Sequence, residues 1–555
     1  MLLSRRFLLA AALLAAFSYH DVLAARKTVC TITVNSADER EAFRRYLPAD
    51  QYDFVELVER GRPDWLASAC RQQVRCDVLL ISGHFDGGDE FYSDRVDARE
   101  SLPVDEMERA SCSDSCPGLF SQLKEVYLFG CNTLNAEKLS STSADVTRAL
   151  LRSGHSPADA ERVAQLLDAR HADSNRDKMR MIFKDVPVIY GFSSKAPLGA
   201  KAGPMLERYF KSGAASIGSG RPSEKLLSLF TGSSMTEASG STDSDPQASY
   251  RRDMCQFVDD RLSPAQRVGF VHSLLGRDVT EVRAFLDPLE KYTASLTPVD
   301  RADAAVSKGL AEIAADAHAS ERWLAFARDT DEPAVRARMI GLAGRFGWLS
   351  PSSMQAELAR LVHDLYAKNE VGNADVELVC TLNGDHVLDS ALAGIAPVAA
   401  SRDIAHAALL ACAGSAGARA QLIDALTSGR DRDVALAQVY LKHHPIADVG
   451  DFRAVALRIA RMNDVDAQVR ALDTLAEHRV SDRESLESLA RLFPVAKTVN
   501  VQRAIAGILI RSDYEAIAKP ELVRALREKR LKSPDGQDLI DVLIRRMQAS
   551  LSRAA

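Results

Sequence analysis

Two short apolar runs, each closing on a glycine and one reactive side chain, most constrain how this 555-residue chain can fold. Residues 77–85 read DVLLISGHF and carry His84, and residues 125–133 read EVYLFGCNT and carry Cys131. A continuous branched apolar run of this length predicts a strand buried on both faces of a parallel sheet. Parallel sheets place their chemistry just beyond the carboxyl ends of such strands. If the two strands are neighbours, an imidazole and a thiol meet at one edge of the sheet.

The segments around these strands predict an α/β domain at residues 25–230. Branched apolar stretches predict further strands at residues 28–34, 52–58 and 185–192. Apolar residues at helical spacing, with capping serines at several starts, predict helices at residues 36–47, 65–74, 143–153, 156–171 and 203–212. Strands that alternate with helices indicate parallel βαβ units, so we expect a three-layer domain with a mostly parallel sheet.

Beyond this domain the composition changes twice. Residues 231–252 are short of large apolar side chains and rich in Ser, Gly and Thr, which predicts a flexible linker. Residues 253–555 read as helices with short breaks, several beginning with an acidic or amide residue followed by Val or Ile. The recurring Val or Ile positions are Val335, Val376, Ile404, Val434, Val469 and Val501. This pattern resembles HEAT-type repeats, which stack into a helical superhelix, and an irregular helical bundle is the alternative.

The first residues predict export. Arg5 and Arg6 precede an apolar run at residues 7–17, and residues 22–24 offer a small-residue cleavage pattern. This arrangement predicts a signal peptide at residues 1–24, of the general secretory or the twin-arginine type, with an uncleaved membrane anchor as the alternative. No later stretch is apolar enough to span a bilayer. With a net charge of −6 and no basic stripe, nothing points to nucleic acid. We therefore expect an exported protein, periplasmic or secreted.

The chain has nine cysteines, and disulfides are expected among them because the destination of an exported protein is oxidising. An odd number leaves at least one thiol unpaired within the chain. Cys112 and Cys116 flank a tight polar segment, and Cys70 lies close to Cys76, so these four are candidates for disulfides. Their connectivity cannot be deduced from sequence. A metal site is the alternative, but the segment CSDSC has no nearby histidine.

The pairing of an imidazole with a thiol has a specific chemical use. Cysteine acts as a nucleophile through its thiolate, and a neighbouring histidine can accept the thiol proton and return it to a leaving amine. Backbone N–H groups at the strand ends can stabilise the oxyanion that forms during the reaction. Gly83 and Gly130 support this interpretation, because glycine best tolerates a sharp exit from a strand.

The segments Ser82-Gly83-His84 and Gly130-Cys131-Asn132-Thr133, each ending an apolar strand, resemble the caspase-like cysteine peptidases. The resemblance covers roughly residues 27–215 and implies that Cys131 is the nucleophile and His84 the general base and acid. It also implies that the backbone N–H groups of Phe85 and Cys131 are the oxyanion donors. The function implied is cysteine endopeptidase activity on protein or peptide substrates, with no metal or organic cofactor. The helical region would bind a protein partner.

Two features of the sequence differ from common members of this family. Phe85 occupies a position that is usually glycine, and the caspase pentapeptide QACRG is absent, with GCNT closer to CHAT domains and separases. Asp86, Asp89 and Glu90 follow His84 and either attract a basic substrate side chain or form a solvated acidic loop. The alternative function is a non-catalytic scaffold that keeps the fold and holds Cys131 in a disulfide.

Overall fold

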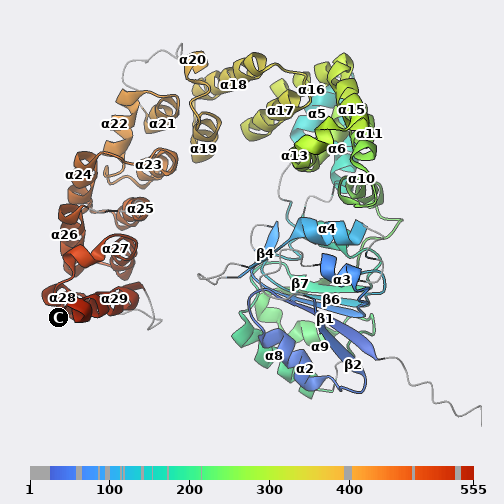
Figure 1. The fold of residues 1–555 in the computed structure, drawn as a ribbon, viewed down its shortest axis with the longest axis horizontal. Coiled ribbons are helices and arrows are strands. Elements are labelled where there is room, and N and C mark those ends of the chain that lie inside the picture. The colour runs from blue at the N-terminus through green and yellow to red at the C-terminus, as the bar shows by residue number, and fades with distance from the viewer. Residues whose placement is uncertain are drawn as a thin grey trace, which may run out of the picture. The chain divides into compact units, whose positions relative to one another are not determined.

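A computed structural model describes most of the chain, in two compact units, Met1–Ile313 and Ala314–Ala555, which we describe separately (Figure 1). The described residues are 26–57, 66–85, 88–93, 100–112, 116, 119–138, 143–152, 154–171, 174–213, 216–392, 403–477, 480, 482–531 and 539–554. The predicted signal peptide at residues 1–24 therefore lies outside them, as does Asp86.

The first unit is built on a six-stranded sheet in the order β2-β1-β3-β6-β7-β8. Its strands are β1 (Lys27–Thr33), β2 (Tyr52–Glu56), β3 (Val78–Ser82), β6 (Glu125–Phe129), β7 (Val188–Phe192) and β8 (Met235–Ala238). The first five are parallel, and β8 runs antiparallel to β7. Every residue of β3 and β6 is buried, as expected for central strands covered on both faces. The predicted mostly parallel sheet is confirmed.

Helices cover both faces of the sheet and make three layers (Figure 1). One face packs against α2 (Asp38–Tyr46), α8 (Gly199–Lys211) and α9 (Glu224–Leu229), and the other against α3 (Ala67–Arg71), α4 (Val104–Cys112) and α7 (Asn175–Ile182). Alternate residues of β3 divide between the two cores: Val78 and Leu80 join the first, and Leu79 and Ile81 the second. The branched apolar run of β3 therefore supplies side chains to the hydrophobic cores on both faces of the sheet.

Other elements of the first unit lie outside this central repeat. A short hairpin of β4 (Glu90–Tyr92) and β5 (Ser101–Pro103) follows β3 and leads into α4. The helices α5 (Ser143–Arg152) and α6 (Pro157–Arg170) pack against each other where two helices were predicted. The remaining helices are α10 (Ala248–Val258), α11 (Pro264–Leu275), α12 (Val279–Val282), η2 (Arg283–Phe285), α13 (Leu286–Ser295), α14 (Pro298–Ala302) and α15 (Ala304–Ala315).

The prediction of a flexible linker at residues 231–252 is wrong. This stretch contains η1 (Thr231–Ser233), the edge strand β8 and the start of α10. Its small residues serve close packing: a Cβ on Gly240 would lie 1.9 Å from the carbonyl oxygen of Phe183. The Gly240 N–H donates to the carbonyl of Val186, and the Ser241 N–H to that of Arg180. At Gly240 a small residue is therefore required because two segments of backbone approach closely.

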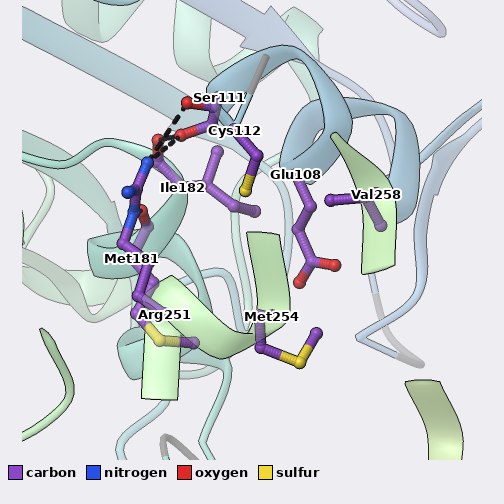
Figure 2. A pocket seen from close by; sticks show the side chains of 8 residues that line it. All are labelled: Glu108, Ser111, Cys112, Met181, Ile182, Arg251, Met254 and Val258. Atoms are coloured by element: carbon purple, nitrogen blue, oxygen red, sulfur yellow. Dashed lines mark hydrogen bonds between the residues drawn. The ribbon is translucent and has the colours of Figure 1, made fainter. Parts of the chain in front are cut away.

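The two units divide after Ile313, later than the boundary predicted at residue 252, because α10 is bound back onto the α/β domain. A disulfide joins Cys112 at the end of α4 to Cys255 on α10. Arg251 of α10 donates from Nη2 to the carbonyl and hydroxyl oxygens of Ser111, and from Nε to the carbonyl of Met181 (Figure 2).

All nine cysteines lie among the described residues, and eight of them form disulfides. The bonds are Cys30–Cys76, Cys70–Cys116, Cys112–Cys255 and Cys380–Cys412. The four candidates from the sequence are therefore all bonded, although only one bond, Cys70–Cys116, joins two of them. The unpaired thiol that an odd count requires is Cys131.

The second unit is a stack of helices in two layers (Figure 1). One layer contains α17 (Pro333–Arg345), α19 (Asn373–Leu382), α21 (Ile404–Cys412), α23 (Asp431–His443), α25 (Val465–Ala476), α27 (Val499–Arg511) and α29 (Leu539–Ala554), with successive members in contact. The other contains α18 (Pro351–Tyr366), α20 (Asp389–Leu392), α22 (Ala416–Ala425), α24 (Val449–Ile459), α26 (Arg483–Leu492) and α28 (Pro520–Glu528). The stack also includes α16 (Ala317–Asp329), η3 (Phe493–Val495) and η4 (Tyr514–Ile517).

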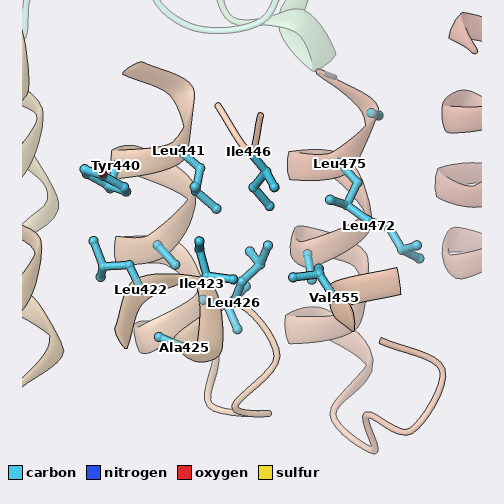
Figure 3. Packing of buried hydrophobic residues seen from close by; sticks show 14 of the residues in the cluster. Leu422, Ile423, Ala425, Leu426, Tyr440, Leu441, Ile446, Val455, Leu472 and Leu475 are labelled. Carbon is cyan, nitrogen blue, oxygen red and sulfur yellow. The ribbon is translucent and has the colours of Figure 1, made fainter. Parts of the chain in front are cut away.

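The recurring Val and Ile positions contribute to the core of this stack. Val335, Val376, Val434 and Val501 are buried, whereas Ile404 and Val469 are half-buried. Leucine, isoleucine and valine side chains of α22 to α25 fill the space between the layers, as Figure 3 shows for Leu422, Leu441, Val455 and Leu472. The predicted helical character of this region is confirmed.

Candidate functional site

The strand register places His84 and Cys131 at equivalent positions just beyond the carboxyl ends of two neighbouring strands. Ser82 of β3 pairs with Phe129 of β6, and His84 and Cys131 each lie two residues further along. The Gly83 N–H extends the ladder by donating to the carbonyl of Phe129 at 3.1 Å. The sequence-based expectation that the two strands are neighbours is confirmed.

Glycine is required where these two strands end. A Cβ on Gly130 would lie 2.8 Å from Cβ of Phe85 and 2.9 Å from the carbonyl oxygen of Gly83, closer than side chains approach. Phe85 itself is fully buried, and its ring packs against Phe91 with centroids 4.6 Å apart. The bulk of Phe85 therefore belongs to the hydrophobic core and takes up none of the solvent-facing space at the sheet edge.

His84 is held from both sides. On one side, Nδ2 of Asn35 lies 3.1 Å from Nε2 of His84. On the other, His84 and Tyr92 exchange two backbone hydrogen bonds of 2.9 Å, and the centroids of their rings lie 5.4 Å apart. A half-turn of the Asn35 amide exchanges its NH₂ and oxygen, so it can either donate to Nε2 or accept from Nε2–H. Asn35 was not among the residues predicted, although it lies two residues after β1, which neighbours β3.

The sulfur of Cys131 contacts the loop that follows β7. The Ala196 N–H donates to Sγ at 3.3 Å, and the Asn132 N–H donates to the carbonyl of Ser194 at 2.7 Å. Asn132 has a φ of 60°, a conformation that Asn tolerates better than most residues. The buried hydroxyl of Thr133 donates to the carbonyl of Gly130 and accepts from the Phe192 N–H. A backbone donor at the sulfur stabilises negative charge there.

The backbone N–H groups near His84 and Cys131 fall into two sets. Those of Gly83, His84 and Asn132 donate to backbone carbonyls. Within the described parts of the chain, no residue accepts a hydrogen bond from the N–H of Phe85 or of Cys131. These are the two N–H groups for which the family resemblance implies a role.

Asn175, at the start of α7, contacts the loops that follow both strands. Its Nδ2 donates to the carbonyl of Asn132 at 3.1 Å, and a Cβ on Gly88 would lie 2.6 Å from its Oδ1. Its side chain is buried, at 3% exposure. Asn175 is not among the predicted site residues because no helix is predicted at α7, although the preceding Ser174 is a capping serine whose hydroxyl accepts from the Asp177 N–H.

The acidic residues proposed for substrate binding are only partly placed. Asp89 is exposed, and its carbonyl accepts from the Val104 N–H. Glu90 is half-buried at the start of β4, paired with Pro103. In the portion of the chain that the structure describes, no group of His, Cys, Asp and Glu side chains is placed to hold a metal ion.

Comparisons with known proteins found no relative. No family model matches the chain, and neither the curated proteins nor the solved structures contain a match. None of the helices that the structure describes is long and apolar enough to cross a membrane.

Proposed function

We propose that this protein is an exported cysteine endopeptidase of the caspase-like type, with Cys131 as nucleophile and His84 as general base and acid. One observation carries the proposal. Of nine cysteines, the single unbonded thiol lies two residues beyond the carboxyl end of β6, and a histidine lies two residues beyond the paired end of the adjacent strand β3. Eight cysteines in four disulfides support an oxidising destination, where an unpaired cysteine needs a separate explanation.

The chemistry follows from these positions. The thiol of Cys131 gives its proton to His84 and attacks a peptide carbonyl carbon, forming a carbon–sulfur bond and an oxyanion. His84 then returns the proton to the leaving amine as the peptide bond breaks, and water hydrolyses the acyl-enzyme. The amide nitrogen of Asn35 faces Nε2 of His84; if the amide is turned so that its oxygen accepts from Nε2–H, Nδ1 is the nitrogen that exchanges the proton.

The oxyanion requires donors that are not already used by the fold. The N–H groups of Phe85 and Cys131 meet this requirement among the described residues, whereas those of Gly83, His84 and Asn132 do not. The burial of the Phe85 side chain removes the steric objection to its backbone serving in this way. The alternative of a scaffold with a bonded Cys131 lacks such support, because Cys131 is the free thiol.

The test is cleavage of a peptide library and of unfolded protein substrates by the full chain. Cys131→Ala should abolish cleavage while leaving the melting temperature within a degree or two, because the side chain is small and only half-buried. His84→Gln should reduce cleavage strongly and keep the fold. Unchanged cleavage by the Cys131 variant would remove the proposal. A wild-type protein whose Cys131 resists alkylation and that cleaves nothing would favour the scaffold.

The helical unit is proposed to be HEAT-like and to bind the protein substrate or a partner. Its two-layer stack, with Val or Ile recurring at the start of successive helices, supports this assignment. Its layer of α25, α27 and α29 carries a depression of about 260 Å³, which Asp473, Arg503 and Arg511 border. Arg503→Glu with Arg511→Glu should slow cleavage of protein substrates and leave short peptides unaffected. Equal effects on both substrates would contradict a docking role.

A further inference from the structure

Glu39 is a buried carboxyl group beside the candidate site that the chemistry above does not use. It lies in the first turn of α2, is 2% exposed, and accepts a hydrogen bond of 2.8 Å from the hydroxyl of Ser82. Ser82 is itself 3% exposed and stands two residues before His84. Burying a carboxylate is costly unless it is well bonded, so an acid at this position calls for a reason beyond packing.

Ser82 connects Glu39 to the group that holds His84. Its carbonyl accepts from the Val34 N–H at 2.9 Å and from the Asn35 N–H at 3.2 Å, at the point where the chain leaves β1. The side chain of Asn35 in turn contacts Nε2 of His84 at 3.1 Å. A shift of Ser82 therefore moves the backbone of Asn35 and also the backbone that leads through Gly83 to His84.

The surroundings of Glu39 make it sensitive to protonation. Burial raises the pKa of Glu39 above its usual value, and the neighbouring carboxylate of Asp38 raises it further. Hydrogen bonds from its own backbone N–H and from the hydroxyls of Ser82 and Ser36 act in the opposite direction. From α8, the backbone of Gly199 approaches Ser36 and Asp38 and brings no charge to this cluster.

We propose that Glu39 is a positioning residue for the Cys131–His84 site, which holds the imidazole through Ser82 and Asn35 and releases this hold when it is protonated. The inference rests on the proposed function of His84. An ionised Glu39 accepts from the Ser82 hydroxyl, whereas a protonated carboxyl offers a weaker acceptor and becomes a donor itself. The site is therefore best ordered when Glu39 is charged, and its order declines as pH falls through the pKa of Glu39.

The experiment compares Glu39→Gln, Ser82→Ala and the double variant in the full chain. Glu39→Gln should lower kcat roughly tenfold, keep KM within about twofold, and remove one ionisation from the acidic limb of the pH profile. If Glu39 acts through Ser82, the double variant should be no slower than Ser82→Ala alone. Additive losses in the double variant would overturn the proposed route.

Glu125→Gln is the matched control. Glu125 is 1% exposed and lies on β6 at the opposite, amino edge of the same sheet, where it accepts from the backbone N–H groups of Ser219 and Gly220. Its variant should lower the melting temperature without changing the pH profile. If Glu39→Gln behaves in the same way as Glu125→Gln, Glu39 is only structural and the proposal is wrong. Should Glu39→Gln fail to fold, the comparison rests on Ser82→Ala, which must reduce kcat at unchanged KM.

A second readout separates this proposal from the proposed function. Alkylation of Cys131 by iodoacetamide follows the thiolate fraction and requires no peptide cleavage. Glu39→Gln should alter the acidic limb of the alkylation profile, and Glu125→Gln should not. A wild-type protein that cleaves nothing but shows this difference retains the positioning role and loses the peptidase assignment. A cleaving wild type with identical profiles in all three proteins retains the peptidase and loses the role of Glu39.

Discussion

Replacing Glu108 by glutamine should raise the free energy of unfolding above that of wild type at alkaline pH. At acidic pH the two proteins should be equally stable. Glu108 lies on α4, in a small pocket that is closed by apolar side chains of α10 (Figure 2). Burial raises the pKa of Glu108 from 4.5 to about 7, and Asp105 adds to this rise, while Lys291 and Lys178 oppose it. The folded protein therefore favours the protonated carboxyl, which is the reverse of the usual preference for a glutamate.

The size of the effect follows from that pKa. A pKa near 7 in place of 4.5 means that folding disfavours the ionised form by about 3 kcal/mol. Below pH 4.5 the carboxyl is protonated in both states and this penalty is absent. Between pH 4.5 and about 7 the folded state binds more protons than the unfolded state, so stability falls as pH rises. Above about 7 the penalty is complete.

Urea denaturation of the full chain, with disulfides intact, at two pH values tests this reasoning. Because glutamine has a similar shape and no charge, Glu108→Gln should match wild type near pH 4.5 and exceed it by up to about 3 kcal/mol at pH 8. Glu106→Gln, which removes the partner of Arg109 on the same helix, is the control and should not show this gain. A difference between Glu108→Gln and wild type that is the same at both pH values would refute the reasoning.

Three further substitutions test the packing that positions the candidate site. Gly130→Ala should destabilise the protein by about 2 kcal/mol through its clash with Phe85, measured by thermal denaturation; a neutral result would contradict the close approach. Thr133→Val should lower the free energy of unfolding by about 2 kcal/mol and slow alkylation of the nearby Cys131, because two buried hydrogen bonds are lost. An alkylation rate equal to that of wild type would show that Thr133 does not position the sulfur. Replacing both Cys112 and Cys255 by serine should lower the free energy of unfolding by about 3 kcal/mol and increase hydrogen exchange in α10. Unchanged exchange would mean that other contacts hold α10 in place.

The central strands, and the position of His84 and Cys131 beyond their carboxyl ends, could be predicted, because a doubly buried parallel strand has an unmistakable composition and its carboxyl end is fixed by direction. Asn35 could not be singled out with the same certainty. Asparagine after a strand is common, and only the arrangement of β1 beside β3 gives it a partner.

Composition misled where contacts between distant segments decide. The Gly- and Ser-rich stretch containing Gly240 resembles a linker in sequence, but the backbone of Phe183, far away in the chain, requires that small residue. The boundary predicted at residue 252 lies before the observed division for a related reason, since Cys255 looks like an isolated cysteine until its partner Cys112 is known. Local patterns carry no information about either contact.

The disulfide connectivity has a consequence for how the chain reaches its native state. Every bond in the first unit passes over at least one other cysteine: Cys30–Cys76 passes over Cys70, and Cys70–Cys116 passes over Cys76 and Cys112. A chain oxidised in the order in which its thiols emerge during synthesis would pair neighbours and trap itself in non-native bonds.

Native pairing therefore requires either that the α/β domain folds before oxidation or that wrong bonds are exchanged afterwards. Such exchange needs an attacking thiolate. Cys131 lies between Cys112 and Cys255 in sequence and ends without a partner. An exchange of wrong bonds would therefore have one thiol in this chain, that of Cys131, which no native disulfide uses.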